Sequence, residues 1–130
     1  MRLLLDTHVL LWATANPERL TQNLRHALAA PGNTVFVSAA SVWEIAIKRA
    51  LGRIVFPLED LDSVLARAGF EEFPITAAHA IAAGGLPRHH ADPFDRMLIA
   101  QAQVEDLTLV SEDAAFGAYD VRLFGAGPGR

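Results

Sequence analysis

Acidic residues follow three short apolar runs of this 130-residue sequence, and their types suit the binding of divalent cations. The runs are residues 3–5, 35–37 and 107–110. Asp6 directly follows the first run, Glu44 lies in the helical segment after the second, and Asp113 follows the third, while Asp95 lies in the helix expected before the third run. The sequence has no cysteine, so a metal would bind oxygen or imidazole, and hard oxygen ligands favour Mg²⁺ or Mn²⁺ over zinc.

Carboxylates gathered in this way suit phosphodiester hydrolysis. Two ions roughly 4 Å apart can activate a water on one side of the phosphate and stabilise the leaving oxygen on the other. No protein nucleophile is then required. A single shared site would also explain why acids recur after successive strands, because ligands of open parallel sheets bind beyond the carboxyl ends of the strands.

Each acid also has a purely structural interpretation. Asp6 and Asp113 are suited to capping the helical turns that follow them, and Asp92 precedes Pro93, a favoured first helical residue. Glu44 can pair with Lys48 one turn later, an interaction worth a few tenths of a kcal/mol when exposed. Capping alone does not require the acids to share one end of the sheet.

The elements that must position these acids alternate between strands and helices. We expect strands at residues 3–5, 35–37, 108–110 and 121–124, with a weaker one at 70–74. Apolar spacings of three and four predict helices at residues 7–15, 21–30, 40–51, 58–68, 76–83 and 93–105. This order predicts one three-layer α/β/α domain, residues 1–124, around a parallel sheet of four or five strands, followed by a flexible tail at 125–130.

Composition places few further limits on function. Of all residues, 52% are hydrophobic and 20% are charged, an ordinary globular mixture. The net charge of −4 argues only mildly against a nucleic-acid partner, because two basic groups are present. They are Lys48, Arg49 and Arg53, and Arg88, His89, His90 and Arg96. The N-terminal apolar run is too short for a signal peptide or a membrane span, so we expect a cytoplasmic protein.

Four segments in this order resemble the motifs of PIN-domain nucleases, and more narrowly those of VapC-type toxins. They are Leu5-Asp6-Thr7-His8, Ser38-x-x-Ser41-x-Trp43-Glu44, residues 92–100 (Asp-Pro-Phe-Asp-Arg-x-Leu-Ile-Ala) and Leu109-Val110-Ser111-x-Asp113. The resemblance, which runs to about Phe124, implies a PIN-like fold and an Mg²⁺- or Mn²⁺-dependent endoribonuclease. It also implies control by a VapB-like antitoxin, and a homodimer. By motif position it assigns the metal carboxylates to Asp6, Glu44, Asp95 and Asp113.

Supporting roles around this site remain open. Asp92 either approaches the metal or only caps a helix, and Ser111 either orients a carboxylate or completes a turn. Thr7 and Ser41 could support the site, but we expect them to cap helices. Lys48 and Arg96 are candidate RNA contacts, with a salt bridge favoured for Arg96.

The remaining aromatic and histidine residues are expected to be structural. We expect His89 and His90 to form a solvated pair and His8 to be partly buried. Trp12 and Trp43 could stack bases, but core or dimer packing is favoured.

The connection after the helix at 40–51 contains the apolar residues Ile54, Val55 and Phe56, which is unusual for a solvated loop. Either it packs on its own core, or Ile54 and Phe56 contact an antitoxin segment bound in a groove between the flanking helices.

Two other functions are compatible with these residues. A phosphatase-like hydrolase would use Asp6 as nucleophile, although its usual second acid is replaced by His8. A catalytically degenerate binding module would retain the acids as caps.

Overall fold

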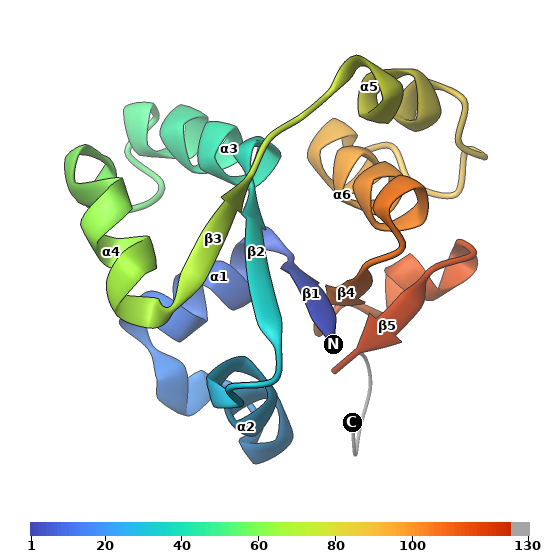
Figure 1. Ribbon diagram of the computed structural model, residues 1–130. Helices are drawn as coiled ribbons and strands as arrows, with labels where there is room; N and C mark the ends of the chain where they lie inside the picture. Colours follow the sequence, from blue (N-terminus) through green and yellow to red (C-terminus); the bar gives the residue numbers. More distant parts are fainter. Residues whose placement is uncertain (126–130) are drawn as a thin grey trace.

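Five short strands form one parallel sheet in the order β3-β2-β1-β4-β5, as the computed structural model shows for residues 1–125, the part of the chain that is described (Figure 1). The strands are β1 (Arg2–Leu5), β2 (Thr34–Ser38), β3 (Phe70–Phe73), β4 (Thr108–Val110) and β5 (Arg122–Phe124). The apolar runs predicted these strands, including the weaker one, and the expectation of a parallel sheet is confirmed. The predicted flexible tail falls mostly on residues 126–130, which lie outside the described residues.

Helices cover both faces of the sheet. They are α1 (Thr7–Ala15), α2 (Gln22–Ala29), α3 (Ala39–Ala50), α4 (Leu61–Ala68), α5 (Ala77–Gly84) and α6 (Pro93–Glu105). Short 3₁₀ turns are η1 (Pro17–Arg19), η2 (Leu58–Asp60) and η3 (Ala114–Ala118). The predicted helix at 58–68 therefore divides into η2 and α4.

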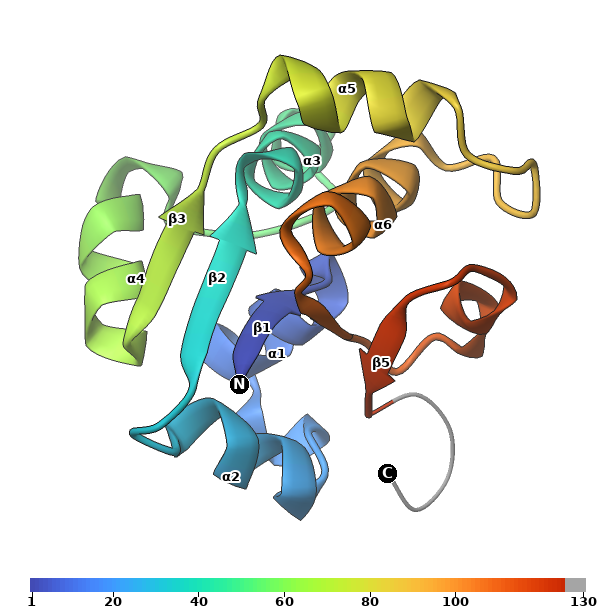
Figure 2. The same cartoon turned by 45° about the vertical axis from the view of Figure 1, so that its right-hand side comes forward.

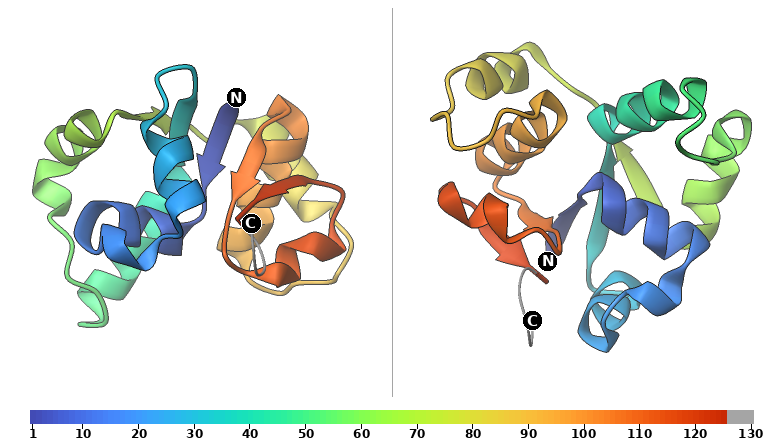
Figure 3. Two further views of the ribbon diagram at one scale, coloured as in Figure 1. Left: turned by 90° about the horizontal axis from the view of Figure 1, so that it is seen from below. Right: turned by 180° about the vertical axis from the view of Figure 1, so that it is seen from behind.

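Side chains of β1 alternate between two apolar cores, as strand geometry requires. Leu3 and Leu5 pack in a core with residues of α1 to α4, whereas Leu4 packs in a second core with residues of α6 and η3. Figure 3 shows α1 and α2 on one side of the sheet and α6 on the other. The three layers of the predicted fold are therefore present.

The central position of β1 determines where functional side chains can meet. β1 pairs with β2 on one side and β4 on the other. All strands are parallel, so the residues that follow β1, β2 and β4 emerge at the same edge of the sheet. No helix within residues 1–125 has the length and hydropathy needed to cross a membrane.

Candidate active site at the carboxyl edge of the sheet

Asp6 is buried at the end of β1 and has two partners. One carboxylate oxygen accepts a hydrogen bond from the Val9 N–H (2.8 Å) and so caps α1, and the other accepts one from Ser111 Oγ (2.5 Å). Burial raises the pKa of Asp6, and the charge of Asp113 raises it further, against the lowering effects of these hydrogen bonds and of His8. Capping thus accounts for one oxygen only. Ser111 fills both of its predicted roles, because its hydroxyl orients the Asp6 carboxylate and also accepts a hydrogen bond from the Asp113 N–H (2.9 Å) in the turn after β4.

Glu44 reaches the same edge from α3 and is 5% exposed. Thr7 Oγ1 donates to Glu44 Oε1 (2.6 Å), and Lys48 Nζ lies 2.7 Å from Oε2. Ser41 Oγ lies 3.0 Å from the Thr7 hydroxyl. The expected pairing of Glu44 with Lys48 is confirmed.

The expectation that Thr7 and Ser41 cap helices is wrong. Asp6 caps α1 and Ser38 caps α3, so Thr7 and Ser41 lie inside the first turns of their helices. Their hydroxyls instead form a short buried chain that ends at Glu44. The chain links α1 to α3 and fixes one oxygen of this carboxylate.

Charged side chains from several other segments change the pKa of Asp95. Burial raises its pKa to about 7, and the charges of Asp92, Glu44 and Asp6 raise it in the same direction. His90 Nε2 lies 3.1 Å from Asp95 Oδ2 and opposes this effect. Asp6, Glu44 and Asp95 come from three separate elements, and the charges of Asp6 and Glu44 both raise the pKa of Asp95. Their joint role as a metal site stays a prediction.

Asp92 and Asp113 act as caps. Asp92 accepts hydrogen bonds from the N–H groups of Phe94 and Asp95 and caps α6, and Asp113 accepts one from the Ala115 N–H and caps η3. Asp113 is exposed, yet its charge acts on Asp6. The structural interpretation of both residues is confirmed, and both remain within electrostatic range of the buried acids.

Glu112 is an acid that the sequence did not single out as a site residue. One of its carboxylate oxygens, Oε1, is buried without a hydrogen-bond partner within residues 1–125. Burial raises the pKa of Glu112, and the charge of Asp6 raises it as well. Its position between Ser111 and Asp113 was the only available signal, because its orientation depends on how the chain turns after β4.

These acids fit a divalent cation in chemistry but do not form a preassembled cage. In the described part of the chain, no three His, Asp or Glu side chains are arranged so that they could hold a metal. The donors are hard oxygens, several repel one another, and Glu112 Oε1 has no hydrogen-bond partner among the described residues. A cation would relieve this repulsion after small side-chain movements, so metal binding stays a prediction.

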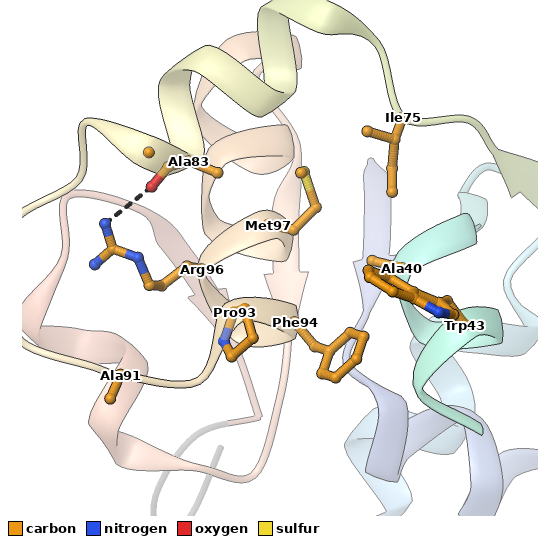
Figure 4. A pocket seen from close by; sticks show the side chains of 10 residues that line it. Ala40, Trp43, Ile75, Ala83, Ala91, Pro93, Phe94, Arg96 and Met97 are labelled. Atoms are coloured by element: carbon orange, nitrogen blue, oxygen red, sulfur yellow. Dashed lines mark hydrogen bonds between the residues drawn. The ribbon is translucent and has the colours of Figure 1, made fainter. Parts of the chain in front are cut away.

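Arg96 does not form the salt bridge expected from its position beside Asp95. Its guanidinium donates to the carbonyl oxygens of Ala83 and Leu86, at the end of α5, and of Pro87 and His90 in the following loop. Figure 4 shows the side chain turned towards Ala83 and away from Phe94. Carbonyl oxygens at a helix C-terminus lack donors within the helix. Arg96 donates to such carbonyls rather than to the neighbouring carboxylate of Asp95.

The histidines also differ from expectation. His90 is half-buried against Asp95 and is therefore not part of a solvated pair. The His89 ring packs edge-on against Tyr119, with centroids 5.2 Å apart. His8 is exposed rather than partly buried, because it lies on the outer side of the first turn of α1.

An apolar hollow of about 340 Å³ lies beside the acids, between α3, α5 and α6 (Figure 4). Trp43 and Phe94 meet there edge to face, with ring centroids 5.2 Å apart. Trp43 is 62% exposed, so it does not belong to the core. Trp12, by contrast, packs against the α1–α4 core.

The connection from α3 to η2 packs on its own domain. Phe56 is 5% exposed and belongs to the core, and Ile54 packs against that core. The expectation that this connection packs on its own core is therefore confirmed, whereas contact of Ile54 and Phe56 with an antitoxin stays a prediction. Val55 is fully exposed.

A family model described as the PIN domain matches residues 3–122. The chain belongs to the PIN domain family. Similar solved structures support the fold of this PIN domain, and three of them are structures of VapBC or FitAcB. They are VapBC2 from Rickettsia felis bound to promoter DNA (19% identity, TM-score 0.70), FitAcB from Neisseria gonorrhoeae (21%, 0.64) and DNA-bound VapBC from Salmonella typhimurium (17%, 0.68).

These alignments include nearly the whole of each chain. They cover 95%, 94% and 95% of this PIN domain and 98%, 96% and 97% of the respective neighbours. The comparison with curated proteins finds no match.

Proposed function

We propose that this PIN domain is an Mg²⁺- or Mn²⁺-dependent endoribonuclease. The observation that carries the proposal is that Asp6 and Glu44 are buried at the carboxyl edge of the sheet with their carboxylates held by Ser111 and Thr7. The raised pKa of Asp95 supports it. Mutually repelling carboxylates near one edge of a sheet destabilise the folded protein unless they serve a ligand, and a cation is the ligand that offsets their charge.

Asp6, Glu44 and Asp95 would hold the cation, and Asp113 and Glu112 would support them. A bound cation supplies Lewis-acid activation of water and of the scissile phosphate. Ser111 holds one oxygen of Asp6, leaving the orientation of its carboxylate fixed before a ligand arrives.

Thr7 fixes Glu44 in the same way, through one of its oxygens. Lys48 neutralises Glu44 while no cation is bound, and its partial exposure leaves it free to turn towards an RNA phosphate. His90 faces Asp95 and can donate a hydrogen bond to that carboxylate.

The biological role that we propose is that of a VapC-type toxin in the cytoplasm, held inactive by a VapB-like antitoxin. Support comes from the whole-chain likeness to structures of VapBC and FitAcB. A groove of about 440 Å³ between α1, the α3–η2 connection and α4 is a suitable place for an antitoxin segment. Its rim includes the fully exposed Val55.

We also propose a homodimer, formed through exposed apolar side chains of α3, of the residue that follows it, and of α5. These are Trp43, Ile47, Leu51 and Ile81, exposed by 62%, 39%, 63% and 77%. Large exposed apolar patches mark interaction surfaces. Light scattering should therefore report twice the chain mass for the wild type and a monomer for Trp43→Glu combined with Ile81→Glu.

A degenerate binding module remains the second candidate. It is favoured by the capping roles of Asp6, Asp92 and Asp113 and by the lack, within residues 1–125, of a preassembled metal cage. Such a module would bind its partner without cleaving RNA.

Cleavage of labelled single-stranded RNA distinguishes the two candidates. The wild type should cleave with Mn²⁺ or Mg²⁺ and not with EDTA. Asp6→Asn and Asp95→Asn should each be inactive while keeping the wild-type circular dichroism spectrum. Arg25→Ala, an exposed change on α2, is the matched control and should stay active. A folded wild type that cleaves no RNA with either metal would support the binding module.

A further inference from the structure

A cavity of about 580 Å³ with a mixed polar and apolar lining lies along the loop between α5 and α6. It is lined by Gly84, Arg88, His89, His90, Ala91 and Arg96. Every ionisable residue of this lining is a base, although the chain as a whole is acidic. The volume lies within the range of ordinary ligand sites.

The loop that forms this cavity is anchored at several points. Arg96 binds three of its backbone carbonyls and that of Ala83 in α5, and the Tyr119 hydroxyl donates to the Pro87 carbonyl (3.0 Å). His90 Nδ1 accepts from the Asp92 N–H (3.2 Å). The cavity is therefore held in shape by side chains of α6 and η3, although Figure 2 shows the loop projecting beyond the helices.

His90 connects the cavity to the acid cluster. Its ring lines the cavity, and its Nε2 lies 3.1 Å from Asp95 Oδ2. Arg88 is exposed, and within residues 1–125 its guanidinium has no acid or carbonyl partner. An arginine available to a ligand, next to carboxylates that would bind metal, is suited to a second phosphate of the same substrate.

We propose that the α5–α6 loop is a binding subsite for the RNA backbone, in which Arg88, supported by His89, contacts a phosphate next to the scissile one. The inference rests on the proposed nuclease function. A polyanionic substrate cannot approach a cluster of carboxylates without compensating positive charge, and this loop supplies it at the border of the cluster. Arg96 takes no part in binding phosphate, because it holds the loop.

The subsite is tested by the binding of a fluorescein-labelled single-stranded RNA in EDTA, followed by fluorescence anisotropy over about 50 to 200 mM salt. Arg88→Ala should weaken binding about tenfold, the loss expected for one charge-assisted hydrogen bond. It should also reduce the slope of log affinity against log salt by about 0.7, the value for one phosphate on a single strand. Arg88→Lys should restore the slope and only part of the affinity.

Arg25→Ala is the matched control, because it removes the same charge from α2 at the far end of the sheet (Figure 1). It should leave both affinity and slope unchanged. Equal effects of Arg88→Ala and Arg25→Ala would overturn the subsite and indicate a diffuse effect of net charge. Wild-type protein that binds no RNA in EDTA would overturn it as well.

The cleavage assay separates the failure of this inference from the failure of the proposed function. Wild type that cleaves RNA with Mn²⁺, together with unaltered RNA binding by Arg88→Ala, would refute only the subsite. If Arg88→Ala impaired the binding of a partner protein and not of RNA, the loop would be a protein contact instead.

Discussion

Asp95→Asn should stabilise the metal-free protein, and by more at high pH than at low pH. The unfolded carboxyl has an ordinary pKa of 3.8, and the folded protein raises it to about 7. The folded state therefore binds this proton more tightly, so the wild type loses stability as pH rises from about 4 to 7. Below about pH 4 the wild type has lost none of this stability, and above about pH 7 it has lost all of it.

The size of the effect follows from the two pKa values. The difference of about 3 pH units corresponds to about 4 kcal/mol above pH 7, at 1.36 kcal/mol for each unit. At about pH 5 only about 1.2 of these units apply, or about 1.6 kcal/mol. The Asp95 side chain is 22% exposed, so solvent reduces both figures. Asparagine keeps the shape and an oxygen acceptor for His90.

Urea unfolding in EDTA measures the effect. After this reduction, the gain in unfolding free energy from Asp95→Asn should be about 1 to 2 kcal/mol larger at about pH 8 than at about pH 5. Added Mn²⁺ should stabilise the wild type at the higher pH and leave the variant nearly unchanged. A gain that does not depend on pH would refute the electrostatic coupling of Asp95 to the other acids.

Three further substitutions examine the groups that hold the acids in place. Ser111→Ala removes the hydroxyl donor of Asp6 and should lower metal affinity by about 10- to 100-fold, as measured by calorimetry, without loss of fold. Thr7→Val leaves Glu44 Oε1 without its donor and should cost about 1 to 3 kcal/mol in urea unfolding, whereas Thr7→Ser should cost much less. Arg96→Gln frees the carbonyls at the end of α5, so amide exchange should accelerate in residues 84–92 and stay unchanged in α2; uniform acceleration would contradict this local role.

The fold was largely predictable because each strand is a short apolar run and each helix has a regular apolar spacing. β1 and β4, covered on both faces, lack polar alternate positions, and α6 begins at the Asp92-Pro93 cap signal. Strand order depends on contacts far apart in sequence. It was not predicted.

The acids of the site were predictable from their positions after strands, but their surroundings were not. Adjacent histidines do not reveal which of them turns inward, so the contact of His90 with Asp95 was missed. Likewise, Arg96 beside an acid suggests a salt bridge, and only the path of the α5–α6 loop shows the carbonyls that it binds. For Phe56, packing on its own domain and contact with a partner both stayed open, because sequence shows that a loop is apolar and not what the loop packs against.

The most direct test of the proposed site is a crystal of the protein soaked in Mn²⁺ and measured for anomalous scattering from the metal. We predict a peak bounded by the carboxylates of Asp6, Glu44 and Asp95, with ligand distances near 2.2 Å, and no such peak in Asp95→Asn. Absence of an anomalous peak among these three carboxylates in the soaked wild-type crystal would contradict the account.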